Sequence, residues 1–335
     1  MNYSGKKQLV RDVRFLSSGS CVPEKVLTNQ DLERMVDTSD EWITTRTGIR
    51  ERRVVDPSQA ASDLAAVAGQ RAMEAAGVKP EDLDAIIVGT VTGDHLFPST
   101  ACLVQAKFGA TRAFCMDVSA ACSGFLYGCE LAHSLISSGK ANLVLVIGVE
   151  ILSKFTDFTD RNTCVLFGDG AGAAVLGVGD ESHHIVSSHL GADGRYGSLI
   201  ELPAGGSRMP ITPEVMEQRL HYLKVKGNEV FKLGVRGMTE ACIKALDDAG
   251  MTAADVDLLV PHQANIRIID ATAKRLEIEP ERVFVNIEKY GNTSAASVPI
   301  ALDEAVRAGR LKEGDLLMLV VFGGGLTWGS MLVRW

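Results

Sequence analysis

The 335-residue sequence lacks three features: long apolar runs, paired cysteines and a basic balance of charge. Its longest apolar runs, such as residues 316–322, have the length of a strand and are too short to span a bilayer, so we expect no membrane insertion. None of the seven cysteines stands in a C-x-x-C spacing, which argues against a zinc site or a redox pair. Residues 1–11 are polar and basic with no apolar segment behind them, so we expect no secretory signal and a cytoplasmic protein with reduced thiols.

The net charge of −8 argues against a nucleic-acid-binding protein, and an anionic partner would have to meet a local basic patch. With 46% hydrophobic and 23% charged residues, the composition is that of a globular protein with an ample core. The length suggests two domains, or one large unit made of two similar halves.

An internal repeat favours two similar halves. Residues 72–87 and 245–260 each read as a helix, a glycine stop, an acidic turn and an apolar strand, and Gly77 and Gly250 differ by 250 − 77 = 173 positions. Further on, residues 121–132 and 294–305 both read as a helix entered through small residues, again followed by an apolar strand. Chance similarity between two α/β segments is the alternative. We predict an α/β fold of two duplicated halves, residues 1–185 and 186–335, with sheets covered on both faces.

One stretch, residues 114–125, predicts a strand, a tight turn of small residues and a helix, with Cys122 at the corner. A thiol at a helix N-terminus is favoured as thiolate, the form that attacks carbonyls, so we expect Cys122 to be a nucleophile with a lowered pKa. Cys115 lies inside the predicted strand and Cys129 inside the helix, where neither can meet a ligand. A buried and inert cysteine is the alternative for Cys122.

Two further side chains lie at positions where an α/β sheet places its site. His262 follows an apolar strand, and it is either a partner for the cysteine or a histidine that holds a loop. Asn292 precedes a predicted helix and either caps it or donates to a carbonyl oxygen. Because Cys122 corresponds to Ala295 in the repeat (295 − 122 = 173), Asn292 belongs to the equivalent corner of the second half. The glycines of residues 323–325 let backbone N–H groups approach a ligand, or form only a turn.

Four motifs in this order resemble β-ketoacyl-acyl-carrier-protein synthase III: residues 119–125, 261–267, 291–299 and 322–329. Residues 38–43 and 45–50 add to the resemblance, which spans essentially the whole chain. It implies the thiolase fold, a five-layer αβαβα sandwich of two duplicated halves, usually as a homodimer. It also implies an acyltransferase that starts type II fatty acid synthesis by condensing a short acyl-CoA with malonyl-acyl-carrier protein, giving 3-oxoacyl-acyl-carrier protein, CoA and CO₂ without a metal or redox cofactor.

The resemblance also assigns roles. Cys122 takes the acyl group, the backbone N–H groups of Cys122 and Gly324 form its oxyanion hole, and His262 and Asn292 hold the malonyl-derived enolate. Trp42 and Arg161 are expected to stack on the CoA adenine, with Arg46 near the phosphates, although Trp42 is otherwise a half-buried surface aromatic. Phe97 is expected to close the partner's acyl pocket and hints at short primers. The residues expected to bind the carrier protein, which otherwise form a solvated basic face, are Gln263, Ala264, Asn265, Ile266, Arg267, Lys274, Arg275 and Arg236.

Other functions fit less well. A papain-like protease shares the order Cys, His, Asn, but its signature and a secretory segment are missing, and neither it nor a cysteine-based α/β-hydrolase suits a duplicated α/β chain. A non-catalytic acyl-CoA-binding relative would lose Cys122, His262 or Asn292. Degradative thiolases use a late cysteine, whereas none follows Cys242, and chain-elongating synthases have His in the place of Asn292. The main alternative is a synthase III-like enzyme that makes other β-keto products in specialised metabolism.

Overall fold

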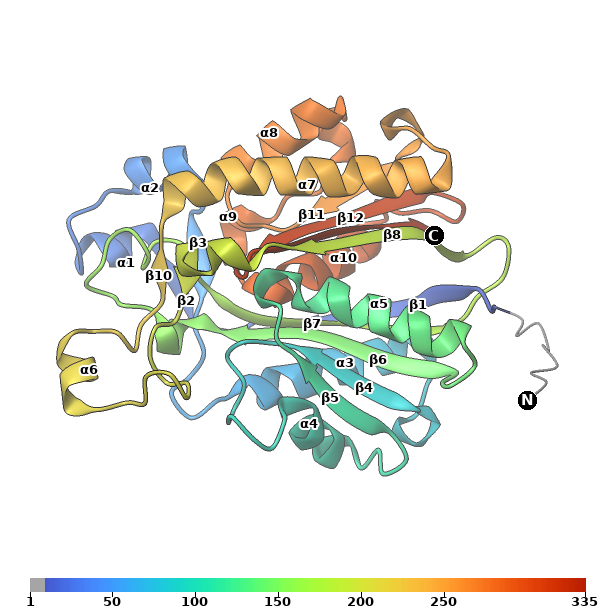
Figure 1. Ribbon diagram of the computed structural model, residues 1–335, viewed down its shortest axis with the longest axis horizontal. Helices are drawn as coiled ribbons and strands as arrows, with labels where there is room; N and C mark the ends of the chain where they lie inside the picture. Colours follow the sequence, from blue (N-terminus) through green and yellow to red (C-terminus); the bar gives the residue numbers. More distant parts are fainter. Residues whose placement is uncertain (1–9) are drawn as a thin grey trace.

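The computed structural model describes residues 10–335 and consists of two sheets with a layer of helices between them (Figure 1). The first sheet has the strand order β1 (Val13–Cys21), β7 (Asp169–Val178), β6 (Leu143–Ile151), β4 (Ala85–Gly89) and β5 (Phe114–Val118). The second has the order β11 (Leu258–Pro261), β12 (Leu316–Gly323), β13 (Thr327–Arg334) and β8 (His184–Ala192). Pairs β4–β5, β4–β6 and β11–β12 are parallel, and the other pairs are antiparallel.

Helices form three layers around the two sheets. The outer pairs are α3 (Ala61–Ala76) with α4 (Thr100–Phe108) on the first sheet, and α7 (Gly227–Ala249) with α8 (Ile266–Leu276) on the second. The central pair, α5 (Gly124–Ser137) and α10 (Ser297–Arg307), packs between the sheets. The predicted thiolase fold, a five-layer αβαβα sandwich, is thereby confirmed.

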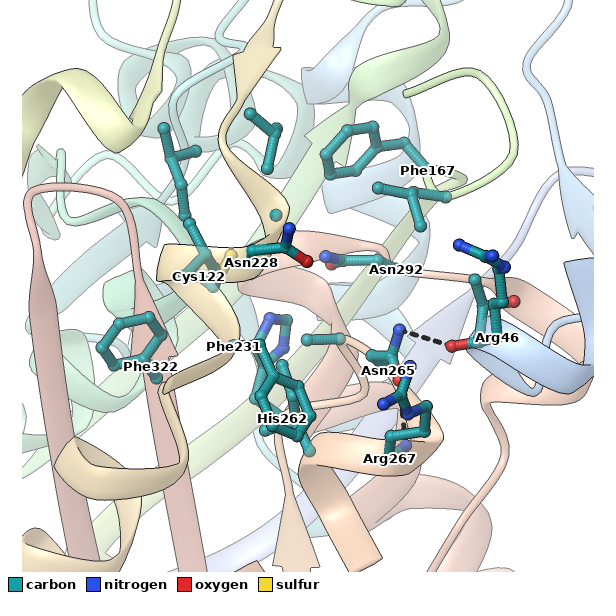
Figure 2. A pocket seen from close by; sticks show the side chains of 18 of the residues that line it. Arg46, Cys122, Phe167, Asn228, Phe231, His262, Asn265, Arg267, Asn292 and Phe322 are labelled. Atoms are coloured by element: carbon teal, nitrogen blue, oxygen red, sulfur yellow. Dashed lines mark hydrogen bonds between the residues drawn. The ribbon is translucent and has the colours of Figure 1, made fainter. Parts of the chain in front are cut away.

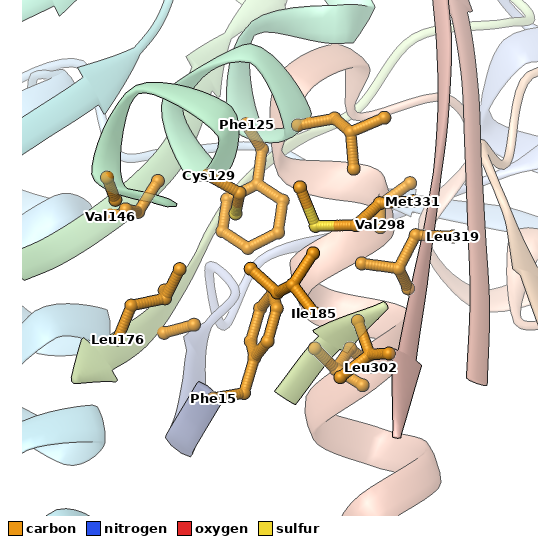
Figure 3. Close-up of a cluster of buried hydrophobic side chains, with 14 of the residues drawn as sticks. Phe15, Phe125, Cys129, Val146, Leu176, Ile185, Val298, Leu302, Leu319 and Met331 are labelled. Atoms are coloured by element: carbon orange, nitrogen blue, oxygen red, sulfur yellow. The ribbon is translucent and has the colours of Figure 1, made fainter. Parts of the chain in front are cut away.

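The core between the sheets explains why the strands are apolar throughout. Both faces of β4 and β12 are covered by helices, and every residue of these strands is buried. Figure 3 shows the central cluster, to which both sheets and both central helices contribute. Among its members are Phe125 and Cys129 of α5, Val298 and Leu302 of α10, Val146 and Leu176 of the first sheet, and Leu319 and Met331 of the second.

The repeat read from the sequence also holds in the backbone. Helices α3 and α7 each end at a glycine, Gly77 and Gly250, and both glycines have a φ of 66°, the left-handed conformation that favours glycine at this position. Strands β4 and β11 begin at Ala85 and Leu258, again 258 − 85 = 173 positions apart. Since β7 ends at Val178 and β8 begins at His184, the chain changes sheets just before the predicted division at residue 185, which stays a prediction.

The remaining elements gather mainly at one end of the sandwich, on the left in Figure 1. They are α1 (Asn29–Glu33), α2 (Asp40–Thr47), β2 (Val26–Thr28), β3 (Glu51–Arg53), α6 (Pro213–Glu217), α9 (Ile287–Tyr290), β9 (Ile200–Glu201) and β10 (Lys224–Val225). Short 3₁₀ helices are η1 (Pro80–Asp82), η2 (Ala121–Ser123), η3 (Leu152–Phe155), η4 (Gly194–Leu199), η5 (Ala253–Asp255), η6 (Pro280–Arg282) and η7 (Ser294–Ala296).

The two sheets differ at their outermost strand. In the first sheet, β5 is a full edge strand, and its Phe114 is 42% exposed. At the matching place beside β11, the described residues of the second sheet have a single parallel bridge between Leu259 and Val283. Within residues 10–335, no helix combines the length and the apolar character needed to cross a bilayer.

Candidate active site

Cys122 lies at the corner between β5 and α5, in the short 3₁₀ helix η2. The preceding residue, Ala121, has a φ of 46°, and this left-handed turn redirects the chain from the sheet into the central helix. Strand β12 of the other half packs directly against the corner. A Cβ added to Gly323 would lie 2.7 Å from the Cys122 backbone nitrogen, so only glycine lets that strand approach.

The second half forms the same kind of corner between residues 292 and 297. Ser294 has a φ of 49°, and it is the counterpart of Ala121 because 294 − 121 = 173. The backbone N–H of Ser294 donates to Asn292 Oδ1 at 2.8 Å, which orients the amide and leaves its NH₂ group free to donate. Strand β6 of the first half packs against this corner, and a Cβ added to Gly148 would lie 2.1 Å from the Ala295 carbonyl oxygen.

His262 follows β11 and is buried, with 1% of its surface exposed. Its Nδ1 lies 2.5 Å from Ser297 Oγ, which itself accepts a hydrogen bond from the Gln263 backbone N–H at 3.4 Å. Because Ser297 Oγ accepts this hydrogen bond, its own hydroxyl hydrogen can be donated to His262 Nδ1. Nδ1 is then an acceptor, which favours the tautomer with hydrogen on Nε2. Burial lowers the pKa of His262 to about 3, so the imidazole is a neutral donor.

Cys122, His262 and Asn292 line one cavity of about 480 Å³ (Figure 2). The cysteine comes from the first half, and the histidine and asparagine come from the second. The two corners contact each other, so the cavity lies at the junction of the two halves. This arrangement brings a thiol and two neutral hydrogen-bond donors to a common space, as the sequence predicted.

The predicted thiolate at Cys122 is wrong. Burial raises the pKa of the Cys122 thiol to about 12, and the charge of Glu150 adds to the rise. Hydrogen bonds from the Ser294 side chain and from the backbone N–H groups of Cys122 and Gly324 act in the opposite direction. The free-energy cost of placing a charge in the packed junction exceeds the stabilisation that the helix N-terminus gives to a thiolate. The resting group is therefore a thiol.

Trp42, Arg46 and Arg161 contact one another at the edge of the cavity. The guanidinium carbons of Arg46 and Arg161 lie 4.7 and 5.0 Å from the centroid of the Trp42 ring, and Arg46 also lines the cavity. Arg161 is held there by a 2.9 Å hydrogen bond to the Asp37 carbonyl oxygen. Its distance from Trp42 leaves no room for a base between them, so a stacked adenine requires Arg161 to swing outward.

The residues expected to bind a carrier protein divide into surface and interior. Arg236, Arg267, Lys274 and Arg275 are exposed, whereas Ala264, Asn265 and Ile266 are partly buried. Two contacts tie down the start of α8: the Asn265 side chain accepts from the Arg267 backbone and donates to the Arg46 carbonyl oxygen at 3.0 Å, the latter drawn in Figure 2.

Gln263 requires a correction. It is 1% exposed, its NH₂ group donates to the carbonyl oxygens of Pro261 and Phe284, and its Oε1 accepts from the Asn286 backbone. A buried amide with its hydrogen bonds satisfied by the fold presents nothing to a partner. Gln263 therefore stabilises the loop that carries His262.

Phe97 lies on the surface, 85% exposed, beside Leu96, which is 88% exposed. A second cavity of about 310 Å³ is lined in part by residues 119–121, next to Cys122. Its lining includes Val91, Ala121, Phe155, Leu202 and Gly324. Apolar side chains dominate this space, which suits a hydrocarbon chain.

Three buried polar side chains near the reacting groups escaped the sequence analysis: Glu150, Ser294 and Ser297. A signal was present for Glu150 alone, since it is the single charged residue in the apolar stretch 143–152. A charge inside a strand that is buried on both faces needs a partner or a function.

Comparisons with known proteins agree on one family. The model described as 3-oxoacyl-[acyl-carrier-protein (ACP)] synthase III matches residues 116–194, and its C-terminal counterpart matches residues 246–335. A beta-ketoacyl-[acyl-carrier-protein] synthase III of Caldanaerobacter subterraneus subsp. tengcongensis is 58% identical over 96% of this chain and 97% of its own. One of Symbiobacterium thermophilum is 55% identical over 97% and 99%. The crystal structure of 3-oxoacyl-[acyl-carrier-protein] synthase III from Aquifex aeolicus VF5 superposes with a TM-score of 0.90 at 48% identity, covering 96% of this chain and 100% of that chain.

Proposed function

This chain belongs to the β-ketoacyl-[acyl-carrier-protein] synthase III family, and from this premise we propose that it is the acyltransferase that initiates type II fatty acid synthesis. It condenses a short acyl-CoA with malonyl-acyl-carrier protein, giving 3-oxoacyl-acyl-carrier protein, CoA and CO₂. A specialised synthase with other β-keto products is not favoured, because relatives that match almost the whole chain carry the synthase III name.

The observation that supports this function is the convergence of Cys122, His262 and Asn292 on one cavity. In the first half-reaction, Cys122 Sγ attacks the acyl-CoA carbonyl carbon and CoA leaves. The backbone N–H groups of Cys122 and Gly324, which lower the pKa of the Cys122 thiol, form the oxyanion hole for the tetrahedral intermediate. The product is a thioester on Cys122.

In the second half-reaction, the malonyl thioester occupies the same cavity. Loss of CO₂ leaves an enolate, whose oxygen accepts hydrogen bonds from His262 Nε2–H and Asn292 NH₂. The orientation of these donors follows from the contacts of His262 with Ser297 and of Asn292 with Ser294. The enolate carbon then attacks the acyl group on Cys122. Atoms and electrons balance with the two thioesters alone, so we propose no metal or redox cofactor.

The surface around the cavity supplies the binding sites. We assign the CoA adenine to Trp42 and Arg161 and its phosphates to Arg46, since an aromatic ring stacked with guanidinium groups suits a nucleotide. The acidic carrier protein meets the exposed cations of α7 and α8: Arg236, Arg267, Lys274 and Arg275. The acyl chain extends from Cys122 into the 310 Å³ cavity.

A homodimer formed through β5 accounts for the exposed apolar surface near it. Unpaired edge strands invite pairing, and Phe114, Leu96 and Phe97 are 42, 88 and 85% exposed. Phe97 of one copy then closes the acyl cavity of the other. The seven cysteines are free, which suits a reducing compartment, and we propose the cytoplasm.

Intact-mass analysis after mixing with acyl-CoAs of different lengths tests the function. We expect one acyl group on the wild-type chain and none on Cys122→Ala. His262→Ala should still be acylated but should not condense malonyl-acyl-carrier protein, because it keeps the nucleophile and loses an enolate donor. A wild-type chain that takes an acyl group from no CoA contradicts the function, and a His262→Ala chain that is never acylated contradicts the division of roles.

A further inference from the structure

Glu150 is a buried carboxyl group beside the nucleophile. It lies near the end of β6, is 0% exposed, and has no cation among its hydrogen-bond partners. Thr92 Oγ1 donates to its Oε2 at 2.5 Å, Thr90 Oγ1 lies 3.4 Å from the same oxygen, and the Val91 backbone N–H lies 3.2 Å away. The carboxyl is thus held firmly, and one oxygen still faces the junction of the two halves.

That oxygen connects Glu150 to the reacting sulfur. Ser294 Oγ donates to Glu150 Oε1 at 3.1 Å. The turn that carries Ser294 packs against the turn that carries Cys122, and the Ser294 side chain lowers the pKa of the Cys122 thiol. Sulfur, hydroxyl and carboxyl therefore lie next to one another where the two corners meet. Of the side chains that face Glu150, those of Thr90, Thr92, Ser294 and Cys122, only the thiol titrates.

The first half-reaction has to move a proton off the sulfur before CoA departs. The resting group is a thiol, and its proton must leave when the sulfur attacks. His262 is unsuited to take it, because burial lowers the pKa of that imidazole to about 3 and its Nε2 already carries hydrogen in the favoured tautomer. An acceptor close to the sulfur lets the proton leave as the new bond forms, before CoA departs as a thiolate that can take one.

We propose that Glu150 receives the Cys122 proton through the Ser294 hydroxyl during acyl transfer and returns it by the same path during condensation. This inference rests on the proposed function and adds a residue to it. Glu150 acts through Ser294 and touches no substrate.

The steps balance as follows. As Cys122 Sγ bonds to the acyl carbon, its proton passes to Ser294 Oγ while the Ser294 proton passes to Glu150 Oε1. The carbon–sulfur bond to CoA breaks, and the CoA thiolate takes a proton from solvent. In condensation, the enolate carbon bonds to the acyl carbon, Cys122 Sγ leaves with the electron pair, and the proton returns from Glu150 through Ser294. The resting thiol and carboxylate are restored.

The electrostatics suit an acceptor that works near neutral pH. Burial raises the pKa of Glu150 to about 7, so the group exchanges its proton under ordinary conditions. The charge of Glu150 raises the pKa of the Cys122 thiol, which keeps the proton on sulfur until the new bond forms. Acylation should therefore rise with pH through about 7, as the carboxyl loses its proton, and level off above.

The experiment measures single-turnover acylation by acyl-CoA over this pH range, using intact mass. In Glu150→Gln we expect acylation to be about 10- to 100-fold slower and to lose its rise near neutral pH. The acylation rate of Ser294→Ala should fall by about the same factor, because this variant breaks the proton path and leaves the threonine contacts of Glu150 in place. Alanine fits the backbone there, since Ala121 has the equivalent conformation, with φ values of 46° and 49°.

Asp169→Asn is the matched control. Asp169 is also fully buried in the first sheet, and its partners are Ser153 and the Val55 backbone, none of them in the site. We expect the wild-type pH profile from this variant, whatever its stability. The double variant of Glu150→Gln and Ser294→Ala should be no slower than either single variant, since both cut one path.

Two outcomes overturn the proposal: wild-type rates and pH dependence in Glu150→Gln, or wild-type rates in Ser294→Ala. If Glu150→Gln does not fold, Ser294→Ala alone decides. Failure here differs from failure of the proposed function, because the wild-type chain is still acylated in the first case and takes no acyl group in the second.

Discussion

The two corners at the centre of the molecule have nearly the same backbone and different chemistry. Ala121 and Ser294 have φ values of 46° and 49°, and each turn leads into a central helix. The next residue is Cys122 in the first corner and Ala295, 1% exposed, in the second. The second corner instead contributes polar side chains before and after the turn, Asn292 and Ser297. The repeated fold thus supplies two equivalent corners. A few side chains make the first corner the source of the nucleophile and the second corner the source of the hydrogen-bond donors.

The sharpest way to break this comparison is to move the thiol from one corner to the other. We expect the double variant Cys122→Ala, Ala295→Cys to carry no acyl group, because position 295 is buried under Gly148 and Gly124 and does not face the cavity. Intact mass and peptide mapping after incubation with acyl-CoA check this. The single variant Ala295→Cys should still be acylated once, on Cys122. An adduct at position 295 would mean that the two corners are interchangeable.

A smaller effect is expected from changing a donor in the second corner and leaving the nucleophile alone. In Asn292→Asp, Oδ1 can still accept from the Ser294 N–H, but the NH₂ donor becomes a carboxylate oxygen. Condensation should fall about 10²- to 10³-fold, as for the loss of one oxyanion donor. Acylation of Cys122, followed separately by intact mass, should change little. Equal losses in both half-reactions would show that Asn292 supports the whole site.

The smallest effects concern the glycines that let each half approach the other's corner. Gly148→Ala and Gly323→Ala should each lower the free energy of unfolding by about 1–3 kcal/mol, with Gly148→Ala the worse, since its added Cβ would lie 2.1 Å rather than 2.7 Å from backbone. Urea denaturation measures this. Gly194→Ala is the control, since a Cβ there meets nothing within 4 Å. A Gly148→Ala chain as stable as the control would contradict the close packing of the junction.

Local signals allowed much of the fold to be predicted from the sequence. Gly77 and Gly250 end their helices because glycine accepts the left-handed conformation, and this made the repeat readable. The small residues around Cys122 predicted a tight turn for the same reason. The convergence of Cys122, His262 and Asn292 followed from the repeat, since equivalent corners of two similar halves meet.

Properties set by packing between the halves could not be predicted in this way. The pKa of the Cys122 thiol is raised by desolvation where the two halves pack together, with Gly323 against the cysteine, and no local pattern in the sequence reports this packing. Gln263 follows His262 in a loop, and only the positions of Phe284 and Asn286 turn its amide inward. Ser294 reads as a helix-capping residue, yet it contacts Glu150 across the junction.

The first sheet ends in the edge strand β5 and the second sheet has no matching strand beside β11 among the described residues, and this difference affects how copies of the chain can associate. Strand β5 has a free edge, whereas the second sheet has only the bridge between Leu259 and Val283 at the matching place. When two β5 edges pair about a twofold axis, the same strand edge is buried in both copies, and neither edge is left to bind a third copy. If two copies pair as proposed, the contact consists of the same patch on both copies, so association through β5 closes at two copies.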